Sequence, residues 1–289
     1  MLKTVWLTEQ LDTKKGTAML LGGFDGLHIG HRRLLSYAKE SGLPVGVMTI
    51  IGGKEQNGLF SFEEREEIFR LAGVDFVFEL PFWEIKDLSP KEFLSVLKKE
   101  FNPKLFVCGE DFRFGAKGAG TPKTIEEDNQ VRVEVQSLVE IDGQKVSSSY
   151  IKTLLKNGDI EKVNCLLGER FFAQGTVFKD RQVGRTIGFP TANIEYPTDK
   201  APLKQGVYET FTQIDGVWYK GITNYGARPT FDDKKVTLET YLDGFKGDLY
   251  GKTLKIEFVR FLRAIQKFES VEDLKEQLTK DIRRIREND

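Results

Sequence analysis

The first half of the sequence alternates short apolar runs with amphipathic segments, and this alternation restricts the fold more than any other feature. The apolar runs have the length of strands and occupy residues 18–21, 45–51, 74–80 and 105–108. Two of the segments between them begin with a capping box, at Ser61 and at Ser89, which is typical of a helix N-terminus. Continuous apolar strands separated by helices favour an α/β fold, with a parallel sheet covered by helices on both faces.

The second half follows a different pattern. From Phe171 onward, strand-like runs rich in glycine and turn residues recur roughly every ten residues, which favours an antiparallel barrel. A charged amphipathic helix is expected to begin at Ser270. A helix-stop signal at Gly158 separates the two patterns. We therefore expect an α/β domain over residues 1–158 and a β-barrel domain with a C-terminal helix over residues 159–289.

Composition and charge exclude several classes of protein. Lys and Arg total 43 against 44 for Asp and Glu, so no global field draws the chain to nucleic acid or to an anionic membrane. No apolar run approaches the roughly eighteen residues of a membrane span, and Glu9 and Asp12 interrupt the region where a signal peptide would lie. Cys108 and Cys165 each fall in an apolar run, and we expect buried free thiols. A cytoplasmic protein is expected.

Residues 21–31 follow the first apolar run and contain both histidines of the chain, His28 and His31. Glycines in this turn let the backbone approach a ligand closely, and the N–H groups of the following helix N-terminus attract anions. Imidazoles placed there can donate hydrogen bonds to phosphate oxygens, as neutral or as charged rings. The turn predicts a nucleotide triphosphate site; the alternative is a buried turn with two incidental histidines.

Two later segments carry groups suited to the same ligand. The loop over residues 109–115 follows a buried strand, and its acidic, basic and aromatic side chains suit a planar phosphorylated ligand, although it can also be a plain loop. Its candidate residues are Asp111, Phe112 and Arg113. A run of serines then opens a helix that ends near Gly158; it either only caps this helix or also binds phosphate. Its candidate residues are Ser147, Ser148, Ser149 and Lys152.

The barrel half contains a second segment suited to a phosphate. Residues 184–193 combine glycines, which allow a flap to close, with the Thr191 hydroxyl and the Asn193 carbonyl oxygen. These hard oxygen ligands suit Mg²⁺ bound to a nucleotide phosphate, although the segment can also be a simple loop. Glu239 alternates with apolar neighbours in a strand, and by pattern alone it is typical of a solvent-exposed residue.

Two motif look-alikes are rejected. The turn at residues 22–30 lacks the spacing of a dinucleotide-binding fingerprint, because Gly26 and Gly30 are in the wrong positions. Residues 247–253 resemble a P-loop, but only three residues separate the two glycines where a P-loop has four. This segment also lies between two strand-like runs, so we interpret it as a turn.

Several motifs together resemble one family. Residues 23–31, with the sequence Gly-Phe-Asp-Gly-Leu-His-Ile-Gly-His, resemble the signature of nucleotidyltransferases that share His-x-Gly-His with class I aminoacyl-tRNA synthetases. Further segments resemble motifs of the bacterial bifunctional riboflavin kinase/FAD synthetases, namely residues 109–115, 147–152, 184–193, 224–231, 238–242 and 261–268. The resemblance covers residues 15–289. It departs from the family at Ser149 and Lys152, which replace threonine and arginine, and at Ala264 and Ile265, where the family usually has acidic residues.

The resemblance implies a Rossmann-like nucleotidyltransferase domain followed by a β-barrel riboflavin kinase domain. The barrel domain would phosphorylate riboflavin to FMN with ATP and Mg²⁺, and the first domain would transfer AMP from ATP to FMN, giving FAD and pyrophosphate. The implied catalytic residues are His28, His31 and Glu239, the last as the base on the ribityl hydroxyl. The implied ATP contacts of the first domain are Gly22, Gly23, Phe24, Asp25, Gly30, Ser147, Ser148, Ser149 and Lys152. The implied flavin contacts are Asp111, Phe112, Arg113 and Arg263. The implied ATP contacts of the kinase are Gly184, Arg185, Gly188, Pro190, Thr191 and Asn193, with Thr191 and Asn193 also binding Mg²⁺.

The expected partners are small molecules, namely riboflavin, FMN and ATP, with no nucleic acid and no membrane, in a monomer or weak oligomer. Three alternatives stay open at the level of sequence. A cytidylyltransferase-type enzyme leaves the barrel motifs unused, and a tRNA synthetase is disfavoured because Lys-Met-Ser-Lys-Ser is missing. In the third alternative, the barrel only binds flavin. The chain is then either a nucleotidyltransferase with a single activity or a non-catalytic flavin sensor.

Overall fold

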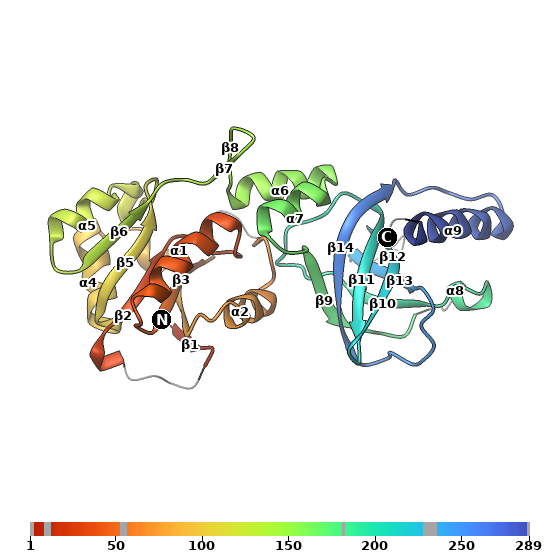
Figure 1. The fold of residues 1–289 in the computed structure, drawn as a ribbon, viewed down its shortest axis with the longest axis horizontal. Helices are drawn as coiled ribbons and strands as arrows, with labels where there is room; N and C mark the ends of the chain where they lie inside the picture. Colours follow the sequence, from red (N-terminus) through yellow and green to blue (C-terminus); the bar gives the residue numbers. More distant parts are fainter. Residues whose placement is uncertain (1–2, 9–12, 53–56, 181–182, 228–235, 288–289) are drawn as a thin grey trace. The chain divides into compact units, whose positions relative to one another are not determined.

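The computed structural model describes residues 3–8, 13–52, 57–180, 183–227 and 236–287. The chain divides into two compact units, Met1–Tyr150 and Ile151–Asp289 (Figure 1). The division falls within a helix that precedes Gly158, so a functional boundary at that glycine stays a prediction. No helix in the described part of the chain combines the length and the apolar character needed to cross a membrane.

The first unit is built on a six-stranded sheet with the order β1-β4-β3-β2-β5-β6. Its strands are β1 (Lys3–Trp6), β2 (Thr17–Leu21), β3 (Val45–Ile51), β4 (Phe76–Pro81), β5 (Pro103–Gly109) and β6 (Arg132–Gln136). Strands β2 to β6 are parallel, and the edge strand β1 pairs antiparallel with β4. The predicted parallel α/β sheet is confirmed.

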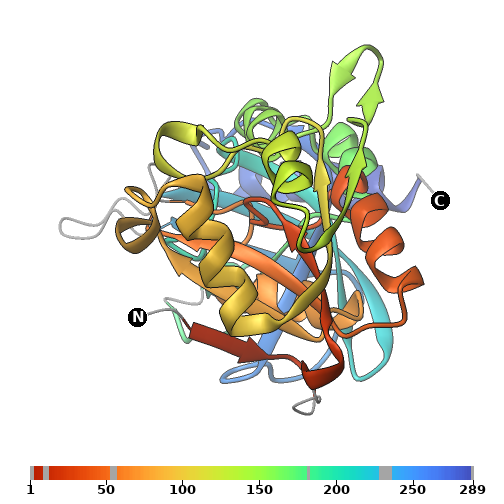
Figure 2. The ribbon, with the colours of Figure 1, turned by 90° about the vertical axis from the view of Figure 1, so that its left-hand side faces the viewer.

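Helices cover both faces of this sheet. They are α1 (Ile29–Glu40), α2 (Phe62–Leu71), α3 (Phe82–Ile85), α4 (Pro90–Phe101) and α5 (Pro122–Asp128), with 3-10 turns at η1 (Thr13–Lys15) and η2 (Ala116–Gly118). Figure 2 shows α1 in orange-red and α4 in gold on opposite sides of the sheet. The capping boxes predicted at Ser61 and Ser89 are both present. Buried side chains of α4, including Phe93 and Leu97, pack with those of the sheet strands into one apolar core.

A small hairpin connects the sheet to the serine segment. It consists of β7 (Glu140–Ile141) and β8 (Gln144–Lys145), joined by Asp142 and Gly143. Both turn residues have positive φ, 53° and 71°, which suits Asp-Gly in a tight hairpin turn. The hairpin leads directly into α6 (Ser148–Asn157).

The second unit is an antiparallel barrel with the strand order β10-β13-β12-β11-β14-β9. The strands are β9 (Phe172–Thr176), β10 (Thr191–Glu195), β11 (Gly206–Ile214), β12 (Val217–Ala227), β13 (Val236–Leu242) and β14 (Thr253–Arg263). A backbone bridge between Phe178, just beyond β9, and Asn193 of β10 brings the two edges together. The sheet is therefore nearly closed, and the predicted barrel is confirmed.

The described residues of this unit also form the helices α7 (Ile160–Leu167), α8 (Val183–Thr186) and α9 (Val271–Arg286). Helix α9 begins after Ser270, as predicted, and its Ile282 and Ile285 pack on the outer face of the barrel with Val207 and Ile222. Both cysteines are free thiols, as expected. The expectation that both are buried is wrong for Cys165, because the apolar run that contains it is part of α7 and Cys165 falls on the exposed side of that helix.

Candidate functional site

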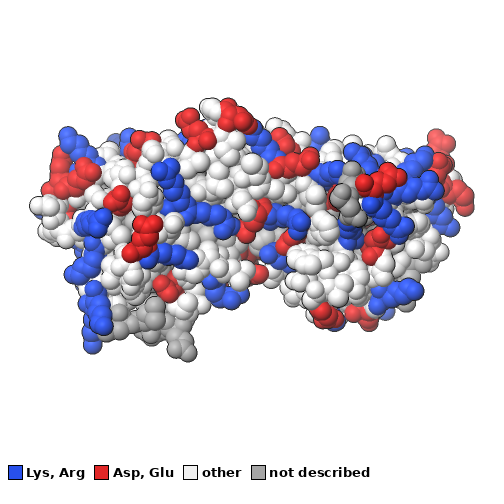
Figure 3. All heavy atoms as spheres, viewed as in Figure 1, with Lys and Arg blue, Asp and Glu red and all other residues white. Residues whose placement is uncertain are grey.

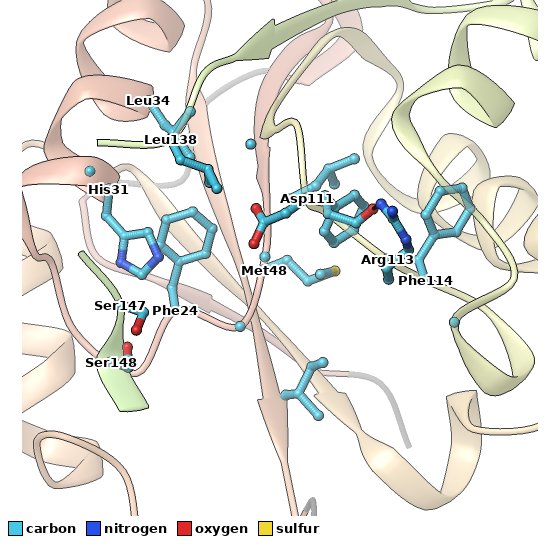
Figure 4. Close-up of a pocket in the computed structure, with 18 of the residues that line it drawn as sticks. Phe24, His31, Leu34, Met48, Asp111, Arg113, Phe114, Leu138, Ser147 and Ser148 are labelled. Carbon is cyan, nitrogen blue, oxygen red and sulfur yellow. Dashed lines mark hydrogen bonds between the residues drawn. The ribbon is translucent and has the colours of Figure 1, made fainter. Parts of the chain in front are cut away.

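The carboxyl ends of the parallel strands in the first unit border a cavity of about 550 Å³. Leu21 ends β2, Gly109 ends β5 and Gln136 ends β6, and all three line the cavity. Ligands of open α/β sheets bind in this position. The predicted residues that line it are Gly22, Gly23, Phe24, His28, Gly30, His31, Asp111, Phe112, Arg113, Ser147 and Ser148. Segments far apart in the sequence therefore meet at one site (Figure 4).

The two histidines lie against each other at the N-terminus of α1. Their rings stack with centroids 3.6 Å apart, and the ring of Phe24 lies 4.2 Å from that of His31. His28 is the N-cap of α1, and its Nδ1 accepts a hydrogen bond from the backbone N–H of His31 at 3.2 Å. Gly30 permits this arrangement, because a Cβ there would lie 3.1 Å from the His28 ring. Both imidazoles thus border the cavity beside a helix N-terminus, where anions are stabilised.

The surroundings of the two rings favour their neutral forms. Desolvation lowers the pKa of His28 well below its usual 6.5, and the nearby His31 and Lys145 lower it further. The pKa of His31 is also lowered, chiefly by desolvation, although its hydrogen bond to Gly26 and the charges of Asp25 and Asp111 act in the opposite direction. Of the two expected forms, neutral or charged, these environments select the neutral one.

Asp25 lies behind the cavity wall and connects three segments. One carboxylate oxygen accepts a hydrogen bond from the backbone N–H of Leu59 at 3.2 Å, and the other accepts one from the Ser148 hydroxyl. Ser147 caps α6 by accepting a hydrogen bond from the N–H of Tyr150 at 3.3 Å. The two serines that line the cavity therefore also hold the start of α6 in place, so capping and a position at the cavity occur together.

Ser149 and Lys152 are the two candidate residues of the serine segment that lie outside the cavity lining. Ser149 is exposed, and Lys152 lies one helical turn further along α6. Their predicted contacts with ATP stay predictions.

The far end of the cavity is aromatic and basic. In Figure 4, Arg113 and Phe114 lie on the opposite side of Asp111 from His31. The rings of Phe112 and Phe114 stack 5.4 Å apart. The cavity thus offers hydrogen-bonding groups for phosphate at one end and flat apolar surfaces at the other.

In the barrel, Glu239 lies at the centre of a polar group on the outer face. In the strand register, Glu239 lies directly opposite Asn193 of β10 on one side and Asn224 of β12 on the other. Directly paired residues of antiparallel strands point to the same face, so the three side chains project together. The opposite face is the barrel interior, where the hydroxyls of Thr223 and Thr240 are hydrogen-bonded at 2.9 Å.

Two cavities meet at Thr191, which lines both. One, of about 480 Å³, is bordered by Pro190, Thr191 and Asn193 together with residues 245–250. The other, of about 310 Å³, is bordered by Gly184, Thr191, Glu239 and Arg263 together with apolar and aromatic side chains. Gly188, among the described residues, borders neither cavity, and its φ of 87° favours glycine. The Arg185 side chain and residues 228–231 lie outside the described part of the chain.

The donor set around Asn193 fits a divalent cation held together with a nucleotide. Asn193 is 6% exposed, and its Oδ1 accepts no hydrogen bond from any described residue. Within the described ranges, no group of three His, Cys, Asp or Glu side chains is placed to hold a metal ion. Mg²⁺ is often bound by one or two protein oxygens and completed by substrate phosphates and water, which matches Thr191 and Asn193.

Arg263 lies in the wall of the smaller cavity with its guanidinium already engaged. Its Nε and Nη2 donate to the Asp281 carboxylate of α9 at 3.0 and 2.8 Å. Its predicted contact with flavin stays a prediction, and its observed role is to hold α9 against β14.

Comparison with known proteins relates both units to described families. Residues 10–150 match the FAD synthetase family model, and residues 167–288 match the riboflavin kinase family model. The bifunctional riboflavin kinase/FMN adenylyltransferase of Bacillus subtilis is 36% identical over 285 residues, covering 92% of this chain and 90% of that protein. The Escherichia coli protein of the same name is 32% identical over 291 residues, covering 93% and 91%. The chain belongs to the bifunctional riboflavin kinase/FMN adenylyltransferase family.

A solved structure is similar over nearly the whole length of the chain. It is titled a macrolide-efflux protein from Streptococcus pneumoniae, and it covers 93% of this chain and 93% of its own, with 28% identity and a TM-score of 0.84. Riboflavin, FMN, FAD and ATP are the substrates and products of the family. The resemblance identified from the motifs is therefore confirmed for both domains.

Sequence reasoning missed several cavity-lining residues, Lys145 and residues 245–250 among them. In the FAD synthetase domain, Lys145 lines the cavity and forms an ion pair with Asp111. In the riboflavin kinase domain, residues 245–250 line the larger cavity. The rejected P-loop look-alike at residues 247–253 is a turn, as predicted, yet part of it borders the site. The Asp142-Gly143 hairpin signal marks the segment that places Lys145. For residues 245–250 the local signal was the P-loop look-alike itself, whose spacing led to its rejection.

Charged side chains of both signs are spread over both domains. On the face seen in Figure 3, Lys and Arg alternate with Asp and Glu, in agreement with a formal net charge of −1. Phosphate binding therefore depends on the local groups of each cavity.

Proposed function

We propose that the barrel domain, residues 159–289, converts riboflavin to FMN, and that the α/β domain, residues 1–158, converts FMN to FAD, each with its own ATP. The observation that carries this proposal is that each unit has its own cavity containing phosphate-binding groups beside apolar or aromatic surfaces. The alternative of a non-catalytic flavin-binding barrel is not favoured, since Glu239 lies among polar groups that suit phosphoryl transfer.

In the kinase, Glu239 acts as the base. It lines the smaller cavity, where Phe189 and Tyr241 offer flat surfaces for the flavin ring. It accepts the proton of the terminal ribityl hydroxyl as that oxygen attacks the γ-phosphorus of ATP and the bond from this phosphorus to ADP breaks. Thr191 and Asn193 would hold Mg²⁺ together with the phosphates of ATP in the larger cavity. The ion would supply stabilisation of the negative charge on the transferring group.

In the adenylyltransferase, the FMN phosphate attacks the α-phosphorus of ATP and releases pyrophosphate. A phosphate is already anionic at neutral pH, so no protein base is required. His28, His31, Ser147 and Ser148 position and stabilise the phosphates of ATP beside the N-terminus of α1. The flavin lies toward Phe112 and Arg113, with Asp111 between the two ends.

Three further predicted residues of the adenylyltransferase have different proposed roles. We assign Asp25 to holding the histidine turn against Ser148, because both of its carboxylate oxygens are engaged. Ser149 and Lys152 remain proposed phosphate contacts. The protein is proposed to act in the cytoplasm as a monomer or weak oligomer, without nucleic acid.

One product assay tests the proposal. Wild-type protein with riboflavin, ATP and Mg²⁺ is expected to yield FMN and then FAD by chromatography. Glu239→Gln is expected to lower FMN formation about 10²- to 10⁴-fold, the usual contribution of a general base, while still making FAD from supplied FMN. The double variant His28→Ala/His31→Ala is expected to accumulate FMN without FAD.

Three results would contradict it. Wild-type kinase rates in Glu239→Gln would remove the base role from Glu239. A folded variant with substitutions in only one domain that loses both activities would argue against two separate sites. FAD made by the wild-type protein only from supplied FMN would favour the single-activity alternative.

A further inference from the structure

We propose that ATP binding to the FAD synthetase domain adds one proton to Nε2 of His31, while His28 remains neutral throughout. The inference rests on the proposed function, which places the phosphates of ATP at the two histidines. It assigns them different tasks, because their hydrogen bonds fix different tautomers.

His28 presents a permanent donor to the cavity. Its Nδ1 accepts the backbone N–H of His31 at 3.2 Å, so Nδ1 carries no proton. In a neutral imidazole the single proton is then on Nε2. His28 can therefore donate to a phosphate oxygen without any change of charge, and protonation would break its cap of α1.

His31 presents the opposite arrangement. Its Nδ1 lies 2.9 Å from the carbonyl oxygen of Gly26, and a carbonyl oxygen only accepts, so Nδ1 carries the proton. Nε2 of the neutral ring then has only a lone pair, which repels a phosphate oxygen. After protonation, Nε2 becomes a charged donor, and hydrogen bonds to charged groups are the stronger kind.

The charged neighbours favour His31 over His28 as the site of uptake. The carboxylates of Asp25 in the histidine turn and Asp111 beyond β5 raise the pKa of His31, whereas Lys145 of β8 lowers that of His28. Arg33 of α1 lines the same cavity. Desolvation nevertheless keeps His31 neutral until the added negative charge of a triphosphate shifts the balance.

The proposal predicts a pH dependence with a definite sign. The pKa of His31 is lowered in the protein alone, and bound triphosphate raises it, so the complex binds more protons than its separated partners. Affinity for ATP should therefore fall with rising pH, by about tenfold per pH unit between the two pKa values. Below both values, and above both, the proton adds no pH dependence.

Nitrogen NMR of the imidazole rings tests this on the full chain. The protein has only two histidines, so the kinase site contributes no imidazole signal. With ATP and no flavin, turnover is prevented. Without ATP at pH 7, we expect His28 protonated at Nε2 and His31 protonated at Nδ1; with ATP, we expect imidazolium shifts for His31 alone.

Two variants assign the signals and isolate the proton. His31→Gln offers an amide N–H that needs no proton uptake, so its ATP affinity should lose the tenfold-per-unit pH dependence relative to wild type. His28→Asn keeps a side-chain acceptor at the N-cap, so it should retain proton uptake at His31. The kinase site is the same in wild type and both variants, so its contribution to the measured ATP binding cancels in the comparison.

The outcomes separate the inference from the function beneath it. FAD formation with both rings neutral when ATP is bound, or with His28 as the charged ring, overturns the inference alone. A pH dependence retained in His31→Gln overturns it as well. Unmoved imidazole signals with ATP, together with no FAD from FMN and ATP, remove the proposed adenylyltransferase function itself.

Discussion

At the scale of single residues, Asn193, a proposed Mg²⁺ ligand, differs in its hydrogen bonding from a side chain that stabilises the fold. A buried oxygen without a hydrogen bond costs about 1–3 kcal/mol of stability, and native proteins contain few of them. Asn193 Oδ1 is such an oxygen, whereas the hydroxyl of Thr223, in the same barrel, lies 2.8 Å from that of Thr210 and 2.9 Å from that of Thr240. The first residue suits a ligand, and the second stabilises the fold.

Substituting Asn193 should therefore separate activity from stability. In Asn193→Ala, we expect FMN formation to fall by about 10- to 100-fold, as when support of a bound metal is removed, with an unchanged or slightly raised Tm without ligands. The control Thr223→Val should lower the free energy of unfolding by about 1–3 kcal/mol and leave the kinase rate near wild type. Thermal unfolding measures the stability of both variants, and a kinase assay measures their activity. A stable Asn193→Ala protein with full kinase activity would contradict the metal role.

At the scale of elements, α9 packs on the barrel through an apolar face and a buried ion pair, with further polar contacts that include Arg286 with Asp243. Asp281 is 4% exposed and accepts hydrogen bonds from Arg263 of β14 and from Gln277 at 2.8 Å. Leu274 and Leu278 of the same helix line the smaller kinase cavity. The position of α9 therefore determines the wall against which flavin is proposed to bind.

Removing the carboxylate of Asp281 should loosen α9. Asp281→Ala leaves the Arg263 guanidinium without its partner, at a cost of about 3–5 kcal/mol, the range typical when one member of a buried pair is lost. We expect a raised KM for riboflavin, a lower Tm and an unchanged rate of FAD formation from supplied FMN. Lys280→Ala breaks an exposed pair with Glu276 on the same helix and is the control, with no measurable change expected. An unchanged KM in Asp281→Ala would remove α9 from the flavin site.

At the scale of the whole molecule, each cavity is formed by residues of one compact unit. The adenylyltransferase cavity is lined by residues between 21 and 148, and the kinase cavities by residues between 177 and 278. Neither site, as described, borrows a side chain from the other unit. The two half-reactions should therefore be separable between molecules.

Mixing two inactive proteins tests this separation. Glu239→Gln alone and His28→Ala/His31→Ala alone should each fail to make FAD from riboflavin, for opposite reasons. An equimolar mixture should make FAD, because FMN formed by one protein passes through solution to the other. FAD production is expected to rise with the concentration of both variants. If the mixture made no FAD while each variant kept its remaining activity, separate sites would be contradicted.

Local patterns in the sequence determined the two architectures and the order of their elements. The apolar runs of the first half became parallel strands, the capping boxes at Ser61 and Ser89 became helix N-termini, and the change of pattern after Gly158 became an antiparallel barrel. These features depend on neighbours within a few residues, so the sequence contains them directly. The histidine turn was also recognisable, since it follows a strand and opens a helix.

Contacts between distant segments were decided only by the tertiary structure. Asp25 and Ser148 are 123 residues apart, and Lys145 reaches Asp111 only because the β7–β8 hairpin returns to the cavity. Asn193 lies beside Glu239 through the register of β10 on β13, and residues 245–250, between β13 and β14, border the cavity beside Asn193. The tautomers of His28 and His31 likewise follow from the backbone atoms beside each ring. Local sequence does not encode these contacts, because strand register, sheet closure and burial arise only when the whole core is packed.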